Sequence, residues 1–122
     1  MDSKDTLNAK AEDLGRLLSQ SSEVQALQRA NLRVADEREL NERLNRLAAI
    51  QRELLGALDR GEPPPEELKQ EYETILSEVQ RDPAYQALVA AQENFDRLMH
   101  RVNDGIGRGI DAGTKSRIIL PT

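Results

Sequence analysis

An all-α fold of about five helices is predicted by the composition, the spacing of apolar residues and the absence of any strand pattern. Ala, Leu, Glu, Arg and Gln are abundant, and these residues favour helices. β-branched residues nowhere alternate with polar ones, so no strand is expected. Aromatic residues make up only 2% of the 122 residues, so the helices would pack through Leu, Ile, Val and Ala. The expected architecture is a long antiparallel helical hairpin or bundle with coiled-coil-like packing.

The first two helices are separated by a serine-rich break. Apolar residues at spacings of four and three predict a helix over about 4–19. The stretch "SQSS" (19–22) interrupts this pattern, and its hydroxyl groups suit the N-cap of a short second helix that ends near residue 34.

The third helix, over about 36–60, has the clearest pattern. Asp36 can serve as its N-cap, with Glu39 in the capping-box position. Gly61 suits a C-terminal cap. Residues that step by four and three predict a coiled-coil-like seam with one polar position: Leu40, Leu44, Leu47, Gln51, Leu54 and Leu58.

Two proline-containing breaks then frame the fourth helix. "GEPPPEE" (61–67) forbids helix at its prolines and places two Glu residues in the first turn that follows. "RDP" (81–83) ends the fourth helix, because Asp82 suits an N-cap and Pro83 suits the first position of the next helix.

The fifth helix is expected over about 83–104, with a seam that includes Tyr85, Leu88, Phe95 and Met99. Its length is similar to that of the third helix, which suggests that these two form the long hairpin. Residues 1–104 would then be a single helical domain. The four glycines that begin at residue 105 predict a flexible C-terminal tail over 105–122.

Charge and composition exclude several functional classes. The segment 62–82 has seven acidic and two basic residues, so it carries the whole net charge of −5. An acidic chain repels phosphate groups, which disfavours direct nucleic-acid binding. The absence of cysteine removes disulfides and thiolate metal sites. Neither a signal peptide nor a membrane-spanning apolar run is recognisable, so a cytoplasmic location is expected.

No catalytic, cofactor or metal site is predicted. His100 is the one histidine, which excludes Glu-x-x-His metal pairs and gives no basis for a catalytic triad. "GIGRG" (105–109) follows a helix instead of a strand and lacks the lysine of a phosphate-binding loop. The acidic residues of the fourth helix form either a solvated face or a docking strip for a basic partner. The strip residues are Glu66, Glu67, Glu71 and Glu78.

The apolar seams point to contact with another protein. Wide apolar stripes with few large residues rarely close a self-sufficient core, and leaving them in water is unfavourable. Either the first, second and fourth helices cover the hairpin completely, or a second chain does. We expect a homodimer or higher oligomer. The predicted interface residues are Tyr85, Leu88, Phe95, Met99, Leu47 and Leu54.

Several stretches in this order resemble the YlbF/YmcA family of small helical regulators. They are "SSEVQALQRAN", "VADERELNERLNRLAAIQREL", "RGEPPPEELKQEY" and "DPAYQALVAAQENFDRLMHRVNDGI", while the end "IGRGIDAGTKSRIILPT" is similar to the YlbF branch. The resemblance implies a self-associating, non-enzymatic regulator. Such proteins act in competence, sporulation and biofilm control, within a complex that modulates the endoribonuclease RNase Y and mRNA processing. The branch's cysteine-dependent iron–sulphur binding does not transfer, because the chain has no cysteine.

Two functional hypotheses follow. The first is a cytoplasmic regulator or adaptor that works by protein–protein contact, with itself, with other YlbF/YmcA-type proteins or with RNase Y as partners. The second is a structural or chaperone-like helical oligomer that binds unfolded segments through open helical tips.

Overall fold

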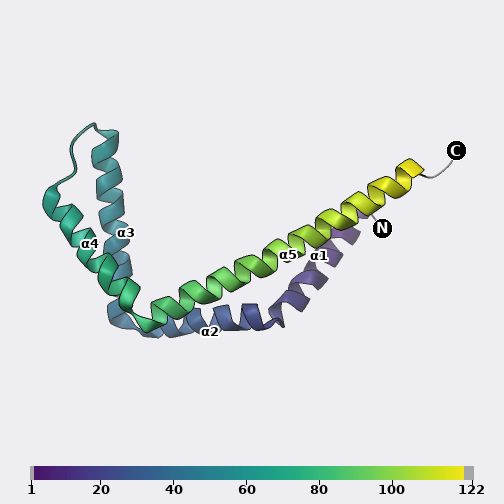
Figure 1. Cartoon of the computed structure of the whole chain (residues 1–122), viewed down its shortest axis with the longest axis horizontal. Coiled ribbons are helices and arrows are strands. Elements are labelled where there is room, and N and C mark those ends of the chain that lie inside the picture. The colour runs from purple at the N-terminus through teal and green to yellow at the C-terminus, as the bar shows by residue number, and fades with distance from the viewer. Residues whose placement is uncertain (1, 120–122) are drawn as a thin grey trace. The chain divides into compact units, whose positions relative to one another are not determined.

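The computed structural model describes residues 2–119, with side chains described for residues 2–115. Five α-helices and no strand occur in this part of the chain, so the predicted all-α fold is confirmed. The helices are labelled in Figure 1: α1 (Ser3–Ser19), α2 (Ser22–Asp36), α3 (Arg38–Asp59), α4 (Glu66–Arg81) and α5 (Pro83–Ile119). None of these helices is both long enough and apolar enough to cross a membrane.

The chain divides into two compact units. Unit 1 combines the N-terminal residues 1–25 with the C-terminal residues 91–122. It therefore contains α1, the first residues of α2 and most of α5. Unit 2 consists of residues 26–90 and contains the rest of α2, α3, α4 and the first residues of α5. The single domain expected over residues 1–104 stays a prediction.

Unit 2 is built around a helical hairpin in which α3 packs along α4 (Figure 1). The sequence pattern predicted α5 in place of α4 as the partner of α3, because α3 and α5 were expected to have similar lengths. The structure instead gives α5 37 residues and α3 22 residues. The prolines of the connection prevent α3 from continuing and let the chain reverse direction. The apolar face of α4 then covers α3 directly after the turn.

The turn out of α3 confirms the predicted glycine cap. Gly61 has a φ of 70°, the left-handed conformation that glycine adopts without steric cost. The Gly61 N–H donates to the Leu58 carbonyl at 3.0 Å, and the Glu62 N–H donates to the Ala57 carbonyl at 2.9 Å. These two bonds form a Schellman motif and satisfy carbonyls that the helix end would otherwise leave free.

Two predicted N-caps are also confirmed. Asp82 Oδ1 accepts hydrogen bonds from the Ala84 N–H at 2.8 Å and from the Tyr85 N–H at 3.4 Å, and α5 begins at Pro83. Ser21 Oγ accepts from the Val24 N–H at 3.2 Å at the start of α2. Each bond satisfies a donor in the first turn of its helix.

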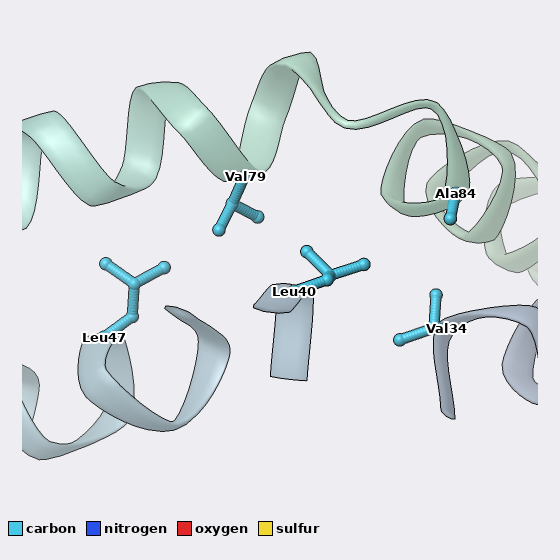
Figure 2. Close-up of a cluster of buried hydrophobic side chains, with 5 residues drawn as sticks. All are labelled: Val34, Leu40, Leu47, Val79 and Ala84. Carbon is cyan, nitrogen blue, oxygen red and sulfur yellow. The ribbon is translucent and has the colours of Figure 1, made fainter. Parts of the chain in front are cut away.

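The core of unit 2 is a cluster of five buried apolar residues, called the unit 2 cluster below. In Figure 2, Val79 of α4 lies above and between Leu47 and Leu40 of α3, while Ala84 of α5 faces Val34 of α2. Leu40 and Val79 are each only 1% exposed. The cluster therefore joins residues from four helices and contains no aromatic side chain.

Two predicted boundaries are wrong. Asp36 is the last residue of α2 and does not cap α3, whose N-cap is Glu37 without a side-chain hydrogen bond. The predicted end of the last helix near residue 104 is also wrong, because α5 continues to Ile119. Glycine lowers helix propensity without forbidding helix. Residues 120–122 of the expected tail lie outside the described part of the chain.

Candidate protein-interaction surfaces

The longest apolar stripe of unit 1 lies along α5. Its members follow one another at spacings of three or four and so share one face of the helix. This set, called the α5 stripe below, consists of Phe95, Met99, Val102, Ile106 and Ile110. The first three are half-buried, whereas Ile106 is 49% exposed and Ile110 is 63% exposed.

Helix α1 adds further apolar exposure to unit 1. Leu7 is 69% exposed and Leu17 is 67% exposed, and α1 has no buried residue. Among the side chains described in unit 1, Ala91 is the buried one. Unit 1 therefore has helices with apolar faces but no large side chain removed from solvent within it.

One ion pair ties the two separate segments of unit 1 together. Arg101 Nη2 of α5 lies 3.2 Å from Glu23 Oε2 in the first turn of α2. The pKa of Glu23 lies below its ordinary value, chiefly because its own backbone N–H bonds to the carboxylate and because Ser22 Oγ donates to it at 2.9 Å. Arg101 lowers the pKa further. The carboxylate is thus held in its charged form opposite the guanidinium.

The predicted interface residues fall into both units. Leu47 belongs to the unit 2 cluster and is 8% exposed, so its side chain is buried within the hairpin. Tyr85 and Leu88 are half-buried and pack against the same cluster. Phe95 and Met99 belong to the α5 stripe of unit 1.

The sixth predicted residue, Leu54, is half-buried on α3, outside the unit 2 cluster. Its neighbour Leu55 is 61% exposed and Leu58, one turn on, is 71% exposed. These two leucines lie in the last two turns of α3, towards the turn of the hairpin. The spacing of apolar residues placed Leu58 in the seam of the third helix, so the exposure of this pair was not predicted.

The predicted acidic strip on α4 is divided by its ion pairs. Glu71 accepts two hydrogen bonds from Arg46, and Glu78 Oε2 lies 2.9 Å from Arg43 Nε. Glu66 and Glu67 are exposed and form no ion pair among the described residues. Glu71 and Glu78 therefore pair with α3 across the hairpin, and only Glu66 and Glu67 remain free of such pairs among the described residues.

Two hollows in unit 2, each of about 270 Å³, are lined by charged side chains of both signs. One lies at the end of the hairpin and includes Arg52, Arg60, Glu53 and Glu62, so opposite charges line it. The other lies beside the start of α3 and includes Glu37, Arg43 and other charged residues. Neither hollow contains a histidine, serine or threonine that could act as a base or nucleophile.

A comparison with models of protein families identifies the family to which the chain belongs. The family model described as "Control of competence regulator ComK, YlbF/YmcA" matches residues 7–111. The chain belongs to the YlbF/YmcA family. No curated protein matches the chain.

Membership of the YlbF/YmcA family confirms the resemblance noted in the sequence and places the chain among regulators. The family match extends through both units and includes the first glycines of the segment that begins at residue 105. That segment was predicted to lie outside the domain. The family's description names control of ComK, a regulatory role.

Proposed function

We propose that this YlbF/YmcA protein is a non-enzymatic cytoplasmic regulator or adaptor that acts through protein–protein contacts. By resemblance, it would act in competence, sporulation or biofilm control or in RNase Y-dependent mRNA processing. Its partners would be a second copy of itself, other YlbF/YmcA-type proteins or RNase Y. The contact surface would be the α5 stripe, with Phe95 and Met99 as anchors.

The exposure of the α5 stripe is the observation that carries this proposal. Ile106 is 49% exposed and Ile110 is 63% exposed, and the described part of unit 1 buries no large apolar side chain. Full burial of one such side chain contributes about 1.5–3 kcal/mol. Since monomeric proteins rarely leave large continuous apolar patches in water, a partner on this stripe accounts for its sequence.

A comparison of two α5 variants tests this proposal. Phe95→Asp should weaken self-association and partner capture, because it places a charge in the stripe. Glu93→Gln, an exposed position on the same helix, serves as the control. Light scattering over a range of protein concentrations measures the first effect, and affinity capture with mass spectrometry measures the second.

The proposal predicts a specific pattern in these measurements. Wild type and Glu93→Gln should form the same oligomer and retain the same partners, and Phe95→Asp should lose both. A wild-type protein that stays monomeric and captures no specific partner would contradict the proposal. So would a Phe95→Asp variant that changes only thermal stability.

A second candidate function is a chaperone-like oligomer that holds unfolded segments. Its supporting observation is the exposed pair Leu55 and Leu58 towards the turn of the hairpin. This function predicts that the protein suppresses aggregation of several unrelated unfolded proteins, and that Leu55→Ser with Leu58→Ser removes the effect. Capture of one partner without general suppression would favour the adaptor.

A further inference from the structure

The joint between α2 and α3 consists of a single residue. Glu37, with φ −95° and ψ 97°, is the one non-helical residue between Asp36 and Arg38. In Figure 1, α3 leaves α2 at a sharp angle at this point. Neither glycine nor proline occurs from Arg33 to Asn41, so the local sequence does not demand a break.

The joint between α4 and α5 shows what a sequence-encoded break looks like. There, Pro83 cannot continue the preceding helix, and Asp82 caps the next one. The α2–α3 joint has no equivalent, because the Glu37 side chain makes no cap bond. Something other than a helix-breaking or capping residue must keep this joint bent.

Asn41 supplies much of what holds the bend. Its Nδ2 group donates to the carbonyls of Val34 at 2.8 Å, Glu37 at 2.9 Å and Ala35 at 3.3 Å. In an uninterrupted α-helix, the N–H groups of Arg38 and Glu39 would bond to the carbonyls of Val34 and Ala35. The Asn41 side chain thus occupies the acceptors that a straight helix would use.

Packing on both sides of the joint also favours the bend. Val34 from α2 and Leu40 from α3 both lie in the unit 2 cluster, together with Ala84 (Figure 2). A straight helix would carry Val34 away from Ala84, because the axis of α2 would then continue that of α3.

The bent joint carries two costs. Glu37 Oε2 is buried and has no hydrogen-bond partner. The first N–H groups of α3 also lack a side-chain cap. Unsatisfied polar groups of this kind destabilise the conformation that contains them.

We propose that the α2–α3 joint is a two-state hinge whose alternative form is one continuous helix from Ser22 to Asp59. Asn41 is the positioning residue that keeps the hinge bent. In the continuous form Val34 leaves the unit 2 cluster, which uncovers apolar surface beside Tyr85 and Leu88. A protein that binds this surface would therefore shift the hinge, because a ligand favours the state that it contacts better. This inference does not depend on the proposed function.

Distance measurements between two spin labels test the hinge. The chain has no cysteine, so Gln28→Cys and Ala48→Cys provide unique attachment sites at exposed positions in unit 2. In the continuous helix the two positions are about 30 Å apart, at about 1.5 Å per residue. In the bent form they are closer, and the two forms give separate distances.

The distance between the two labels should differ among three variants of the doubly labelled protein. Asn41→Ala should raise the ratio of the long to the short distance about tenfold, because the carbonyls of Val34 and Ala35 lose their side-chain donor. Asn45→Ala, the same change one turn later at an exposed position, should match wild type. Adding Glu37→Gly to Asn41→Ala should restore the short distance, because glycine disfavours helix and removes the unpaired carboxylate.

Hydrogen exchange at the Arg38 and Glu39 amides provides a second measurement that does not need the labels. These amides should exchange more slowly in Asn41→Ala than in Asn45→Ala, because the continuous helix gives them carbonyl partners. Identical distance distributions and exchange rates in the two Asn variants would overturn the proposal. If Asn41→Ala does not fold, the single variant Glu37→Gly provides the test. It should speed exchange at the Arg38 and Glu39 amides relative to wild type, and unchanged exchange would overturn the proposal.

Discussion

Arg46 of α3 and Glu71 of α4 meet as a two-point pair across the hairpin. Arg46 Nε donates to Glu71 Oε1 at 2.6 Å, and Arg46 Nη2 donates to Glu71 Oε2 at 2.9 Å. The bond to Glu71 raises the pKa of Arg46. With the Arg43–Glu78 pair at 2.9 Å, this contact aligns the two helices on the outer edge of their packed face.

Glu71→Gln should lower the thermal midpoint of unfolding slightly, because the amide cannot accept two charge-assisted bonds. The loss should shrink at high salt, since salt screens exposed ion pairs. Glu73→Gln on the same helix is the control, because Glu73 is exposed and forms no ion pair among the described residues. Equal midpoints for the two variants at low salt would show that the pair does not contribute to stability.

Leu40→Ala should reduce the free energy of unfolding by about 2–5 kcal/mol, the usual range for removing a buried leucine side chain. Leu40 is 1% exposed in the unit 2 cluster, whereas Leu58 of the same helix is 71% exposed. Leu58→Ala should therefore change stability by about 0.5 kcal/mol or less. Urea unfolding of both variants measures the contrast, and similar losses would mean that Leu58 is covered in solution.

Asp82→Ala should destabilise the protein by about 0.5–2 kcal/mol, because it removes the N-cap of α5. Asp36→Ala is the matched test of the cap that the sequence predicted and the structure lacks. Since Asp36 ends α2 without capping α3, its replacement should cost less than about 0.5 kcal/mol. Chemical denaturation of the two variants compares them, and a larger loss for Asp36→Ala would restore the original prediction.

Glu23 should make stability depend on pH in the acidic range. Its folded pKa lies below the ordinary value of 4.5, so its contribution is present above that value and is lost as the pH falls through the folded pKa. Glu23→Gln should thus have a lower thermal midpoint than wild type at pH 7, and the difference should disappear on acidification below 4.5.

The control for this pH dependence is Glu12→Gln on α1. Glu12 is exposed and forms no ion pair among the described residues, so its replacement should leave the midpoint unchanged across the same pH range. A difference between wild type and Glu23→Gln that persists unchanged at low pH would mean that the glutamine substitution acts through packing.

Local signals in the sequence predicted the breaks well where one residue type has a strong backbone preference. Gly61, Pro83 and Asp82 act within their own turn, and the structure places each as expected. The prediction failed at Asp36, because an acidic residue near a helix start is a weak signal beside the packing of Val34 and Leu40. It failed again at the glycines after residue 104, where α5 continues.

The interaction surface was predictable only as a pattern. Spacing identified Phe95 and Met99 as members of an apolar stripe, and the structure adds that Ile106 and Ile110, at the same spacing, are its more exposed members. Spacing could not distinguish Leu47, which the hairpin buries, from Leu58, which it leaves in solvent. Both lie in the same seam along α3, and the distinction depends on which residues α4 reaches.

The sequence by itself determined an all-helical chain, the family to which it belongs and the joints that proline, glycine and a capping aspartate encode. These features depend on preferences that act over a few residues. Only the tertiary structure decided that α4 is the partner of α3, which apolar residues remain exposed, and that α2 and α3 bend at Glu37. Contacts between residues far apart in the chain select among helical arrangements that local preferences leave nearly equal in free energy.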